Sequence, residues 1–153
     1  MNKLTRLGVT LASGALLALA APAAAQLEEW VDYTPQKEVI ELTYVKVDQG
    51  QLDTYLEGLK QTWVKANEAA KSVGQVTSYG IYVVPYGSNE VNLVLRITYP
   101  SMASLDADKA EYDKFMAAWG KANADSSNRT VIELYNKIRE IKGTYILREI
   151  KLK

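Results

Sequence analysis

The sequence contains no cysteine and no histidine among its 153 residues. Without cysteine, the chain has no disulfide, no thiol nucleophile and no thiolate metal ligand. Without histidine, it lacks the usual general base near neutral pH and the commonest metal ligand in proteins. These absences argue against zinc sites and against serine–histidine catalysis. The sequence therefore implies neither a metal nor a cofactor.

An excess of positive charge is also missing. The chain has 18 basic and 18 acidic residues, and two of the basic ones fall in residues 1–25. The remaining chain has a net charge of 16 − 18 = −2. Proteins that bind nucleic acid gain affinity from released counterions and need a basic surface to do so. We therefore expect no nucleic-acid partner.

One long apolar run lies at the N-terminus. Lys3 and Arg6 accompany an almost wholly apolar stretch over residues 7–21, and residues 23–25 are alanines that precede Gln26. This order is typical of a secretory signal peptide with its cleavage site. A membrane-spanning helix would need about 20 continuous apolar residues. We expect residues 1–25 to be a bacterial signal peptide, which makes the product periplasmic or secreted without a transmembrane anchor.

The rest of the chain, 153 − 25 = 128 residues, has the length of one domain. Residues 26–38 show no sustained period and are predicted to be a leader, so that the domain spans 39–153. Hydrophobic periodicity and turn residues predict the elements of this domain. In chain order they are a strand over 39–47, a helix over 52–73, strands over 76–86 and 91–99 joined by a turn at 87–90, a helix within 101–119, a polar break at 124–128, a helix over 131–141 capped at Gly143, and a strand over 144–152.

This βαββα(α)β order is the ferredoxin-like arrangement of the α+β class. It predicts a four-stranded antiparallel sheet with its helices on one face. The strand over 91–99 shows how the two faces differ. One side is apolar and the other is mixed, with Leu93, Leu95, Ile97 and Tyr99 on the first and Asn92, Val94, Arg96 and Thr98 on the second. A mixed face of this kind suits packing against a second copy, so we predict a homodimer.

Four segments support a family resemblance: the junction over 44–50, the long helix with Trp63, the strand over 79–82 and the closing segment over 139–151. With them the chain resembles the dimeric α+β-barrel superfamily, which includes NipSnap-like proteins, antibiotic-biosynthesis-monooxygenase-like proteins and small exported proteins of unknown role. The resemblance implies two protomers that join their sheets into a barrel, and ligands held between sheet and helices. Some members oxygenate aromatic substrates without a cofactor. Others degrade haem through a histidine ligand, which this chain does not have.

Trp63 and Asn67 are four residues apart and share one side of the predicted long helix. They could orient a planar ligand through an indole wall and an amide. Alternatively, Trp63 continues the apolar stripe of the core and Asn67 is a polar residue at its edge. The sequence favours this second, structural interpretation.

Glu41 and Arg96 lie within the two strands that should be central, where a buried charge is costly unless it is paired. Antiparallel register could bring them together. They could then line a polar cavity, in which Glu41 acts as a base and Arg96 binds an anion, or they could form an ion pair that satisfies both charges. Arg148 on the last strand has the same two interpretations. Tyr82 is one of several tyrosines on the predicted strands, and the chain has ten tyrosines but one phenylalanine. This preference for tyrosine favours a ligand cavity or a partly solvated interface.

Three hypotheses on function follow. The first is an exported dimer that binds a small apolar or aromatic molecule in a cavity between sheet and helices. The second is a cofactor-independent monooxygenase or isomerase that acts on a small aromatic substrate through Trp63, Asn67, Glu41 and Arg96. The third is a non-catalytic interaction protein of the cell envelope. No residue is assigned a catalytic role from the sequence.

Overall fold

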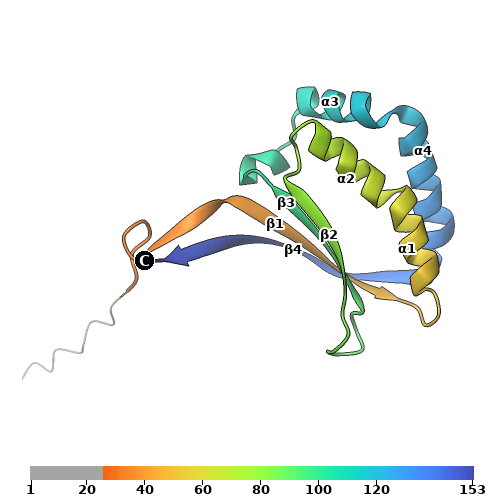
Figure 1. The fold of residues 1–153 in the computed structure, drawn as a ribbon, viewed down its shortest axis with the longest axis horizontal. Coiled ribbons are helices and arrows are strands. Elements are labelled where there is room, and N and C mark those ends of the chain that lie inside the picture. The colour runs from red at the N-terminus through yellow and green to blue at the C-terminus, as the bar shows by residue number, and fades with distance from the viewer. Residues whose placement is uncertain (1–25) are drawn as a thin grey trace, which may run out of the picture.

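The computed structural model describes residues 26–153, and the predicted signal peptide lies outside them. The structure has four strands and a set of helical segments, and Figure 1 shows how they are arranged. In chain order they are β1 (Tyr33–Val47), α1 (Leu52–Gln61), α2 (Trp63–Ser72), β2 (Ser78–Val83), β3 (Leu93–Tyr99), the 3-10 helix η1 (Met102–Leu105), α3 (Lys109–Trp119), α4 (Lys121–Thr130), the π-helix η2 (Val131–Tyr135), α5 (Asn136–Ile138) and β4 (Arg139–Leu152).

The four strands form one antiparallel sheet in the order β2-β3-β1-β4, and the helices lie on one side of it (Figure 1). β1 and β3 are the central strands, as the sequence predicts. This order and this one-sided helical layer confirm the predicted α+β class. The fold is ferredoxin-like.

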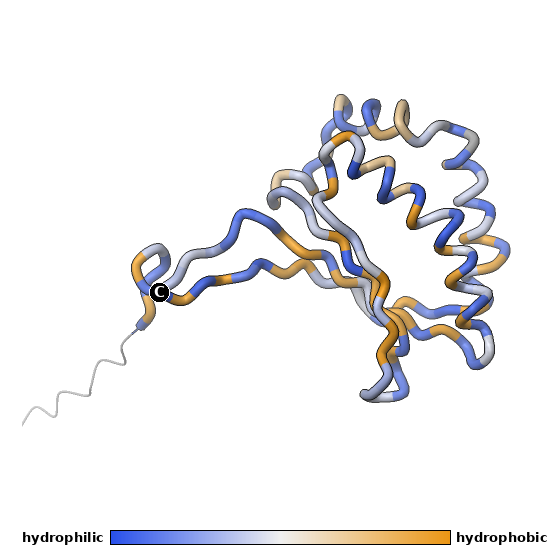
Figure 2. The backbone as a smooth tube through the Cα atoms, viewed as in Figure 1, coloured by the Kyte–Doolittle hydropathy of each residue, from blue (hydrophilic) through white to orange (hydrophobic). Residues whose placement is uncertain are grey.

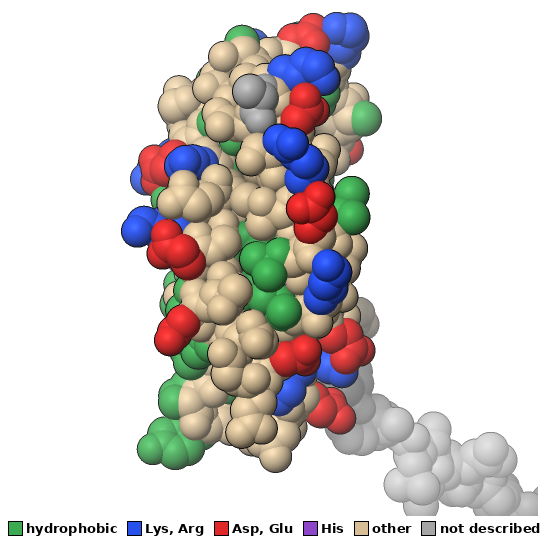
Figure 3. Space-filling model, turned by 90° about the vertical axis from the view of Figure 1, so that its right-hand side faces the viewer, with side chains coloured by type: hydrophobic (Ala, Val, Ile, Leu, Met, Phe, Trp, Pro, Cys, Tyr) green, Lys and Arg blue, Asp and Glu red, His purple; other side chains and the backbone are tan. Residues whose placement is uncertain are grey.

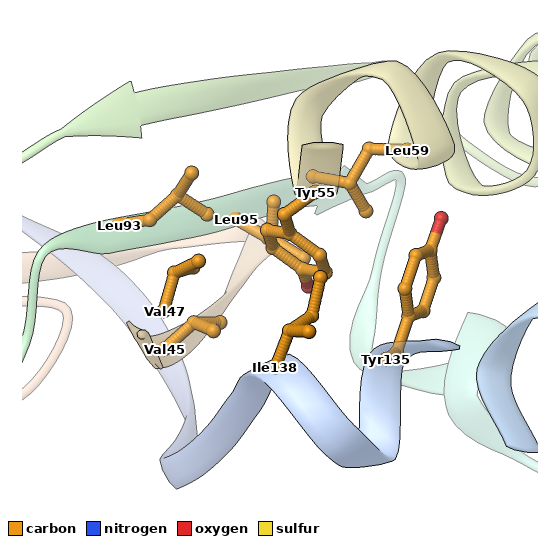
Figure 4. Packing of buried hydrophobic residues seen from close by; sticks show 8 residues of the cluster. All are labelled: Val45, Val47, Tyr55, Leu59, Leu93, Leu95, Tyr135 and Ile138. Atoms are coloured by element: carbon orange, nitrogen blue, oxygen red, sulfur yellow. The ribbon is translucent and has the colours of Figure 1, made fainter. Parts of the chain in front are cut away.

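The main hydrophobic core lies between the sheet and the first and last helical segments (Figure 4). Alternate residues of a strand point to the same face, so the central strands supply every second side chain. The buried members are Val45, Val47, Leu93 and Leu95 from the sheet, and Tyr55, Leu59, Tyr135 and Ile138 from α1, η2 and α5. Full burial of an aliphatic or aromatic side chain of this size contributes about 1.5–3 kcal/mol.

The long helix that the sequence predicts over 52–73 is two helices, because Thr62 interrupts it with φ −116° and ψ −81°. The Thr62 hydroxyl donates to the carbonyl of Gly58 at 3.0 Å and lies 2.7 Å from the hydroxyl of Tyr135. A hydroxyl that bonds back to the preceding turn competes with helical hydrogen bonding and bends a helix. The break therefore accompanies a buried polar contact that periodicity does not reveal.

β1 begins at Tyr33, six residues before the predicted start of the first strand at residue 39. The reason is a partner from the other end of the chain. β4 continues past the body of the sheet, and Tyr33 pairs with Leu152 while Pro35 pairs with Ile150. Residues 33–38 have no strong strand period of their own, but β4 pairs with residues 33–35, and the register shifts between Pro35 and Val39.

The C-terminal boundaries also differ from the prediction. The last helical segment ends at Ile138, because Arg139 already pairs with Val47 and Ile141 with Val45 in the sheet. The predicted polar break over 124–128 lies inside α4. Most of that segment is exposed, and a solvated helix face tolerates polar residues.

Register assigns each strand residue to a face. Glu41 is opposite Ile97, and Leu42 is opposite Arg96. Because Val45 packs in the core beneath the helices, the odd-numbered residues of β1 face the helical layer and the even-numbered ones face away. We call the second side the open sheet face. It contains Ile40, Leu42, Tyr44, Tyr82, Val94, Arg96, Tyr145 and Leu147.

The helical side of the molecule is polar, and basic and acidic side chains are interspersed over it (Figure 3). Figure 2 shows that hydrophobic and hydrophilic residues alternate along the long strands β1 and β4. Within residues 26–153, no helix combines the length and the hydrophobicity that a membrane crossing requires.

Candidate functional site

A pocket of about 250 Å³ lies between α2, α3 and the end of β3. α2 and α3 are neighbouring helices, and both cross the same end of the sheet (Figure 1). Small alanines on α2 leave room beside an aromatic ring on α3. The lining residues are Ala66, Asn67, Ala70, Gln75, Val76, Tyr99, Ser104 and Phe115.

Asn67 is the buried polar residue of this pocket, with 6% of its surface exposed. Its side-chain nitrogen donates to the carbonyl of Trp63 at 2.8 Å. A carbonyl only accepts, so this bond fixes which end of the amide is nitrogen. No hydrogen bond to the amide oxygen of Asn67 is found within residues 26–153. The pocket therefore contains an acceptor that is available to a ligand with a donor group.

Tyr99 brings a second polar group to the same pocket. Its hydroxyl donates to Oε2 of Glu41 at 3.0 Å. Burial raises the pKa of Tyr99 well above its ordinary value, and the negative charge and hydrogen bond of Glu41 raise it further. The phenol is neutral at physiological pH and its one proton is used in the bond to Glu41, so Tyr99 does not act as a base. Glu41 is thus held behind the pocket wall rather than free inside it.

Trp63 lies at the start of α2 and packs against the main core. Its ring meets the edge of Tyr79, with centroids 5.4 Å apart and planes at 86°. Trp63 is not among the residues that line the pocket, in line with its structural interpretation. Asn67 is different, because it is buried and lines the pocket rather than marking a polar edge.

The predicted meeting of Glu41 and Arg96 is wrong. Glu41 faces the helices, whereas Arg96 is on the open sheet face, because their pairing partners are offset by one residue. Arg96 instead donates to the hydroxyl of Tyr82 at 3.0 Å and to that of Ser78 at 3.1 Å, and its guanidinium lies 6.0 Å from the Tyr82 ring centroid. These two charged residues form neither an ion pair nor one cavity.

Arg148 lies neither in the helix–sheet interior nor on the open sheet face, but in a third part of the structure. It pairs with Val39 at the edge of the sheet and borders a shallow hollow of about 410 Å³ together with Trp30, Pro35 and Met102. The six residues predicted as ligand-binding candidates therefore divide among the helix–sheet interior, the open sheet face and the far end of β4. The structure does not bring them together in one site.

Sequence reasoning missed two kinds of residue. Tyr99 and Phe115 line the pocket, but in the sequence they are indistinguishable from other apolar positions of a strand and a helix. Arg139 was also missed. Its guanidinium lies 5.2 Å and 4.8 Å from the ring centroids of Tyr55 and Tyr135 and donates to the Tyr55 hydroxyl. Burial raises the pKa of both tyrosines, although Arg139 opposes this shift.

Within residues 26–153, no group of three acidic, histidine or cysteine side chains is placed to hold a metal ion. What the helix–sheet pocket offers is an open hollow with apolar walls and several polar residues, which are Asn67, Gln75, Ser104 and the neutral phenol Tyr99. Such a site can bind and orient a small molecule through shape and one or two hydrogen bonds.

No family model matches the chain, and no curated protein matches it in sequence. Solved structures do match. A protein from Shewanella oneidensis has 9% identity and a TM-score of 0.45, with 78% of this chain and 97% of that one covered. A dimeric ferredoxin-like protein from an uncultured marine organism has 11% identity and a TM-score of 0.43, with coverages of 76% and 89%.

A third match is a dabb-family protein with a ferredoxin-like fold from Mesorhizobium loti. It has 11% identity and a TM-score of 0.37, and the alignment covers 77% of this chain and all of that one. Likenesses at these identities and scores say nothing about activity. The fold of this chain is established by its own strand order and helical layer.

Proposed function

We propose that this protein is an exported homodimer that binds a small apolar or aromatic molecule in the pocket between α2, α3 and β3. The observation that carries the proposal is Asn67, a buried residue of the pocket wall whose side-chain nitrogen is bonded to the Trp63 carbonyl, which leaves the amide oxygen as an acceptor. A hydrogen-bond acceptor that borders an apolar hollow can fix the orientation of a ligand that has a donor group.

The size of the pocket narrows the ligand class. Pockets for drug-sized ligands measure about 300–1,000 Å³, and this one is smaller, at about 250 Å³. Phe115 and Val76 provide flat and apolar walls, while Asn67 provides the acceptor. A one- or two-ring molecule with a single N–H or O–H donor matches this combination. The Glu41 carboxylate behind Tyr99 disfavours an anionic ligand.

Export and dimerisation complete the proposal. Export rests on the signal-like pattern of residues 1–25. Dimerisation is supported by the open sheet face, where Tyr82 on β2 and Tyr145 and Leu147 on β4 are exposed at the two edges of the sheet, on the side away from the helices (Figure 1). The monooxygenase, isomerase and envelope-interaction hypotheses stay predictions from the sequence.

Calorimetric titration of the purified protein with indole tests the binding. Indole is a two-ring molecule with one N–H donor. Ala70→Leu fills the pocket, whereas Ala117→Leu adds the same side chain to an exposed position on α3 and is the matched control. We expect saturable binding to the native protein and to Ala117→Leu, and at least tenfold weaker binding to Ala70→Leu. Equal affinity in all three proteins would exclude the pocket as the binding site.

A complementary measurement is native mass spectrometry of the protein purified without denaturant. A dimer with additional, releasable mass would support the proposal and would supply the natural ligand for identification. A monomer would contradict the proposed dimer but not the pocket, because the pocket is formed within one chain.

A further inference from the structure

A second hollow lies outside the helix–sheet pocket, where the outer ends of β1 and β4 leave the body of the sheet (Figure 1). We call it the outer hollow. Its volume of about 410 Å³ is within the range of about 300–1,000 Å³ that small-molecule sites have. The segment before β1, β1 itself, η1 and β4 all contribute to it. Its main lining residues are Trp30, Pro35, Gln36, Lys37, Met102 and Arg148.

The outer hollow lies on the helical side of the sheet. Val39 is buried beneath the helical layer, and Arg148 pairs with it across β1 and β4. Residues directly opposite each other in an antiparallel pair share a face, so Arg148 is on the same side. η1 contacts β1, and its Met102 lines the hollow together with Arg148. The outer hollow and the open sheet face are therefore on opposite sides of the sheet.

The charged residues that line the outer hollow are both basic. They are Lys37 and Arg148, and none of the lining residues is acidic. Glu38 and Glu149, their neighbours in the chain, line a different hollow, which Lys37 also borders. Within residues 26–153, the side chain of Arg148 forms no ion pair with a carboxylate. A recess lined by one sign of charge raises the local concentration of ligands of the opposite sign, so the outer hollow favours an anion.

Trp30 is fixed beside these cations in an uncommon backbone conformation. Its φ is +70°, which is unfavourable for a residue other than glycine. Its backbone nitrogen donates to the carbonyl of Tyr33 at 2.7 Å, and its carbonyl accepts from the ammonium group of Lys153. Residues that the surrounding structure holds in such conformations cluster at ligand-binding sites. Trp30 is 62% exposed, so this conformation does not serve to bury the indole in the core.

The lining combines apolar surface with positive charge. Trp30 and Met102 are both exposed, and an indole and a thioether each pack favourably against a flat ring. The guanidinium of Arg148 can bind a carboxylate through two parallel hydrogen bonds. A flat apolar ring that bears a carboxylate therefore matches both parts of the lining.

We propose that the outer hollow binds a small aromatic carboxylate, with Arg148 paired to the carboxylate and Trp30 and Met102 packed against the ring. Of the two interpretations that the sequence leaves open for Arg148, this is the anion-binding one. The site is distinct from the helix–sheet pocket, where the carboxylate of Glu41 behind Tyr99 disfavours an anion.

Calorimetric titration of the purified protein with 2-naphthoate tests the proposal. This probe has two fused rings and a carboxylate, but no N–H donor for the amide of Asn67. We expect saturable binding that weakens as the NaCl concentration is raised, because salt screens an exposed ion pair. Methyl 2-naphthoate lacks the charge and acetate lacks the rings, so each should bind about tenfold more weakly than 2-naphthoate.

Two variants identify the site. Arg148→Gln removes the charge and should weaken 2-naphthoate binding about tenfold. Arg129→Gln makes the same change at an exposed position on α4, so it is the matched control and should leave the affinity unchanged. Trp30→Gly removes the indole but keeps the backbone conformation, because glycine adopts a positive φ freely, and should also weaken binding about tenfold. Far-ultraviolet circular dichroism would show that each variant is folded.

The outcomes separate the outer hollow from the helix–sheet pocket. Ala70→Leu, which fills that pocket, should leave the affinity for 2-naphthoate unchanged. Loss of 2-naphthoate binding in Ala70→Leu would place the probe in the helix–sheet pocket and overturn the proposal. Equal affinity in Arg148→Gln and the native protein, or no saturable binding at millimolar concentrations, would overturn it as well. Absence of indole binding would contradict the proposed function but not the outer hollow.

Discussion

The hydroxyl groups of Thr62 and Tyr135 lie 2.7 Å apart inside the core, 73 positions apart in the chain. Thr62 donates its own proton to the carbonyl of Gly58, so Tyr135 is the donor in the contact between them. This buried bond ties the junction of α1 and α2 to the π-helix η2.

The two ends of that bond should differ in their effect on stability. Tyr135→Phe removes the donor and leaves Thr62 bonded to Gly58, which should cost about 1 kcal/mol of unfolding free energy. Thr62→Val leaves the Tyr135 hydroxyl buried without a partner, which should cost about 1–3 kcal/mol. Urea denaturation of both variants measures the difference. A larger loss for Tyr135→Phe would contradict this assignment of the donor.

Gly58→Ala should destabilise the protein although alanine is the better helix former. A Cβ atom at this position would lie 2.7 Å from Cε1 of Tyr135, whose ring is buried and cannot move away. Overpacking of this kind costs about 1–3 kcal/mol, against a gain of about 1 kcal/mol from helix propensity. Thermal unfolding shows whether the variant is less or more stable. A higher Tm for Gly58→Ala would show that η2 can shift to make room for the added methyl group.

The hydroxyl of Tyr79 should lose its proton at a higher pH than an ordinary tyrosine does. Its hydrogen bond to Glu68 raises its pKa to about 12, from an ordinary value of 10.0. Because the folded form holds this proton more tightly, the stabilisation is present below pH 10.0 and is lost as the pH rises toward 12. Ultraviolet titration of the native protein, with Tyr79→Phe as reference, isolates this residue. Glu68→Gln should bring its pKa back toward the ordinary value, and no change would assign the shift to another cause.

The pocket and the open sheet face should respond separately to mutation. Asn67→Leu removes the acceptor from the pocket and should weaken indole binding about tenfold, equivalent to about 1.4 kcal/mol. Arg96→Gln, on the opposite face of the sheet, should leave indole affinity unchanged. Titration with 1-methylindole provides the chemical control, because it lacks the N–H and should bind the native protein and Asn67→Leu alike. Loss of indole binding in Arg96→Gln would mean that the ligand lies elsewhere.

Much of the architecture could be predicted from local patterns. The alternation of Leu93, Leu95 and Ile97 with a mixed set of residues predicts the two faces of β3 correctly, and the order of strands and helices predicts the sheet correctly. The structural changes at Thr62 and Arg139 could not be predicted from local patterns. A helix break and a helix-to-strand change at these positions depend on contacts with Tyr135 and β1, which are distant in sequence.

The candidate site was less predictable, and Glu41 and Arg96 show why. Both faces of β1 contain apolar side chains, so its sequence does not decide whether Glu41 points toward the helices or away from them. The pairing of Glu41 with Ile97 decides this, and a register shift of one residue would have reversed it. Asn67 stays a candidate, and its burial depends on α3, which packs beside α2.

The sequence by itself determined the alternation within strands, the apolar stripes of the helices and the lack of histidine and cysteine chemistry, because these properties belong to single residues and their near neighbours. The tertiary structure decided which face each polar residue occupies, how far β1 extends, and which amide lines a pocket. These depend on register and packing between distant segments, whose free energies come from contacts that no local pattern contains.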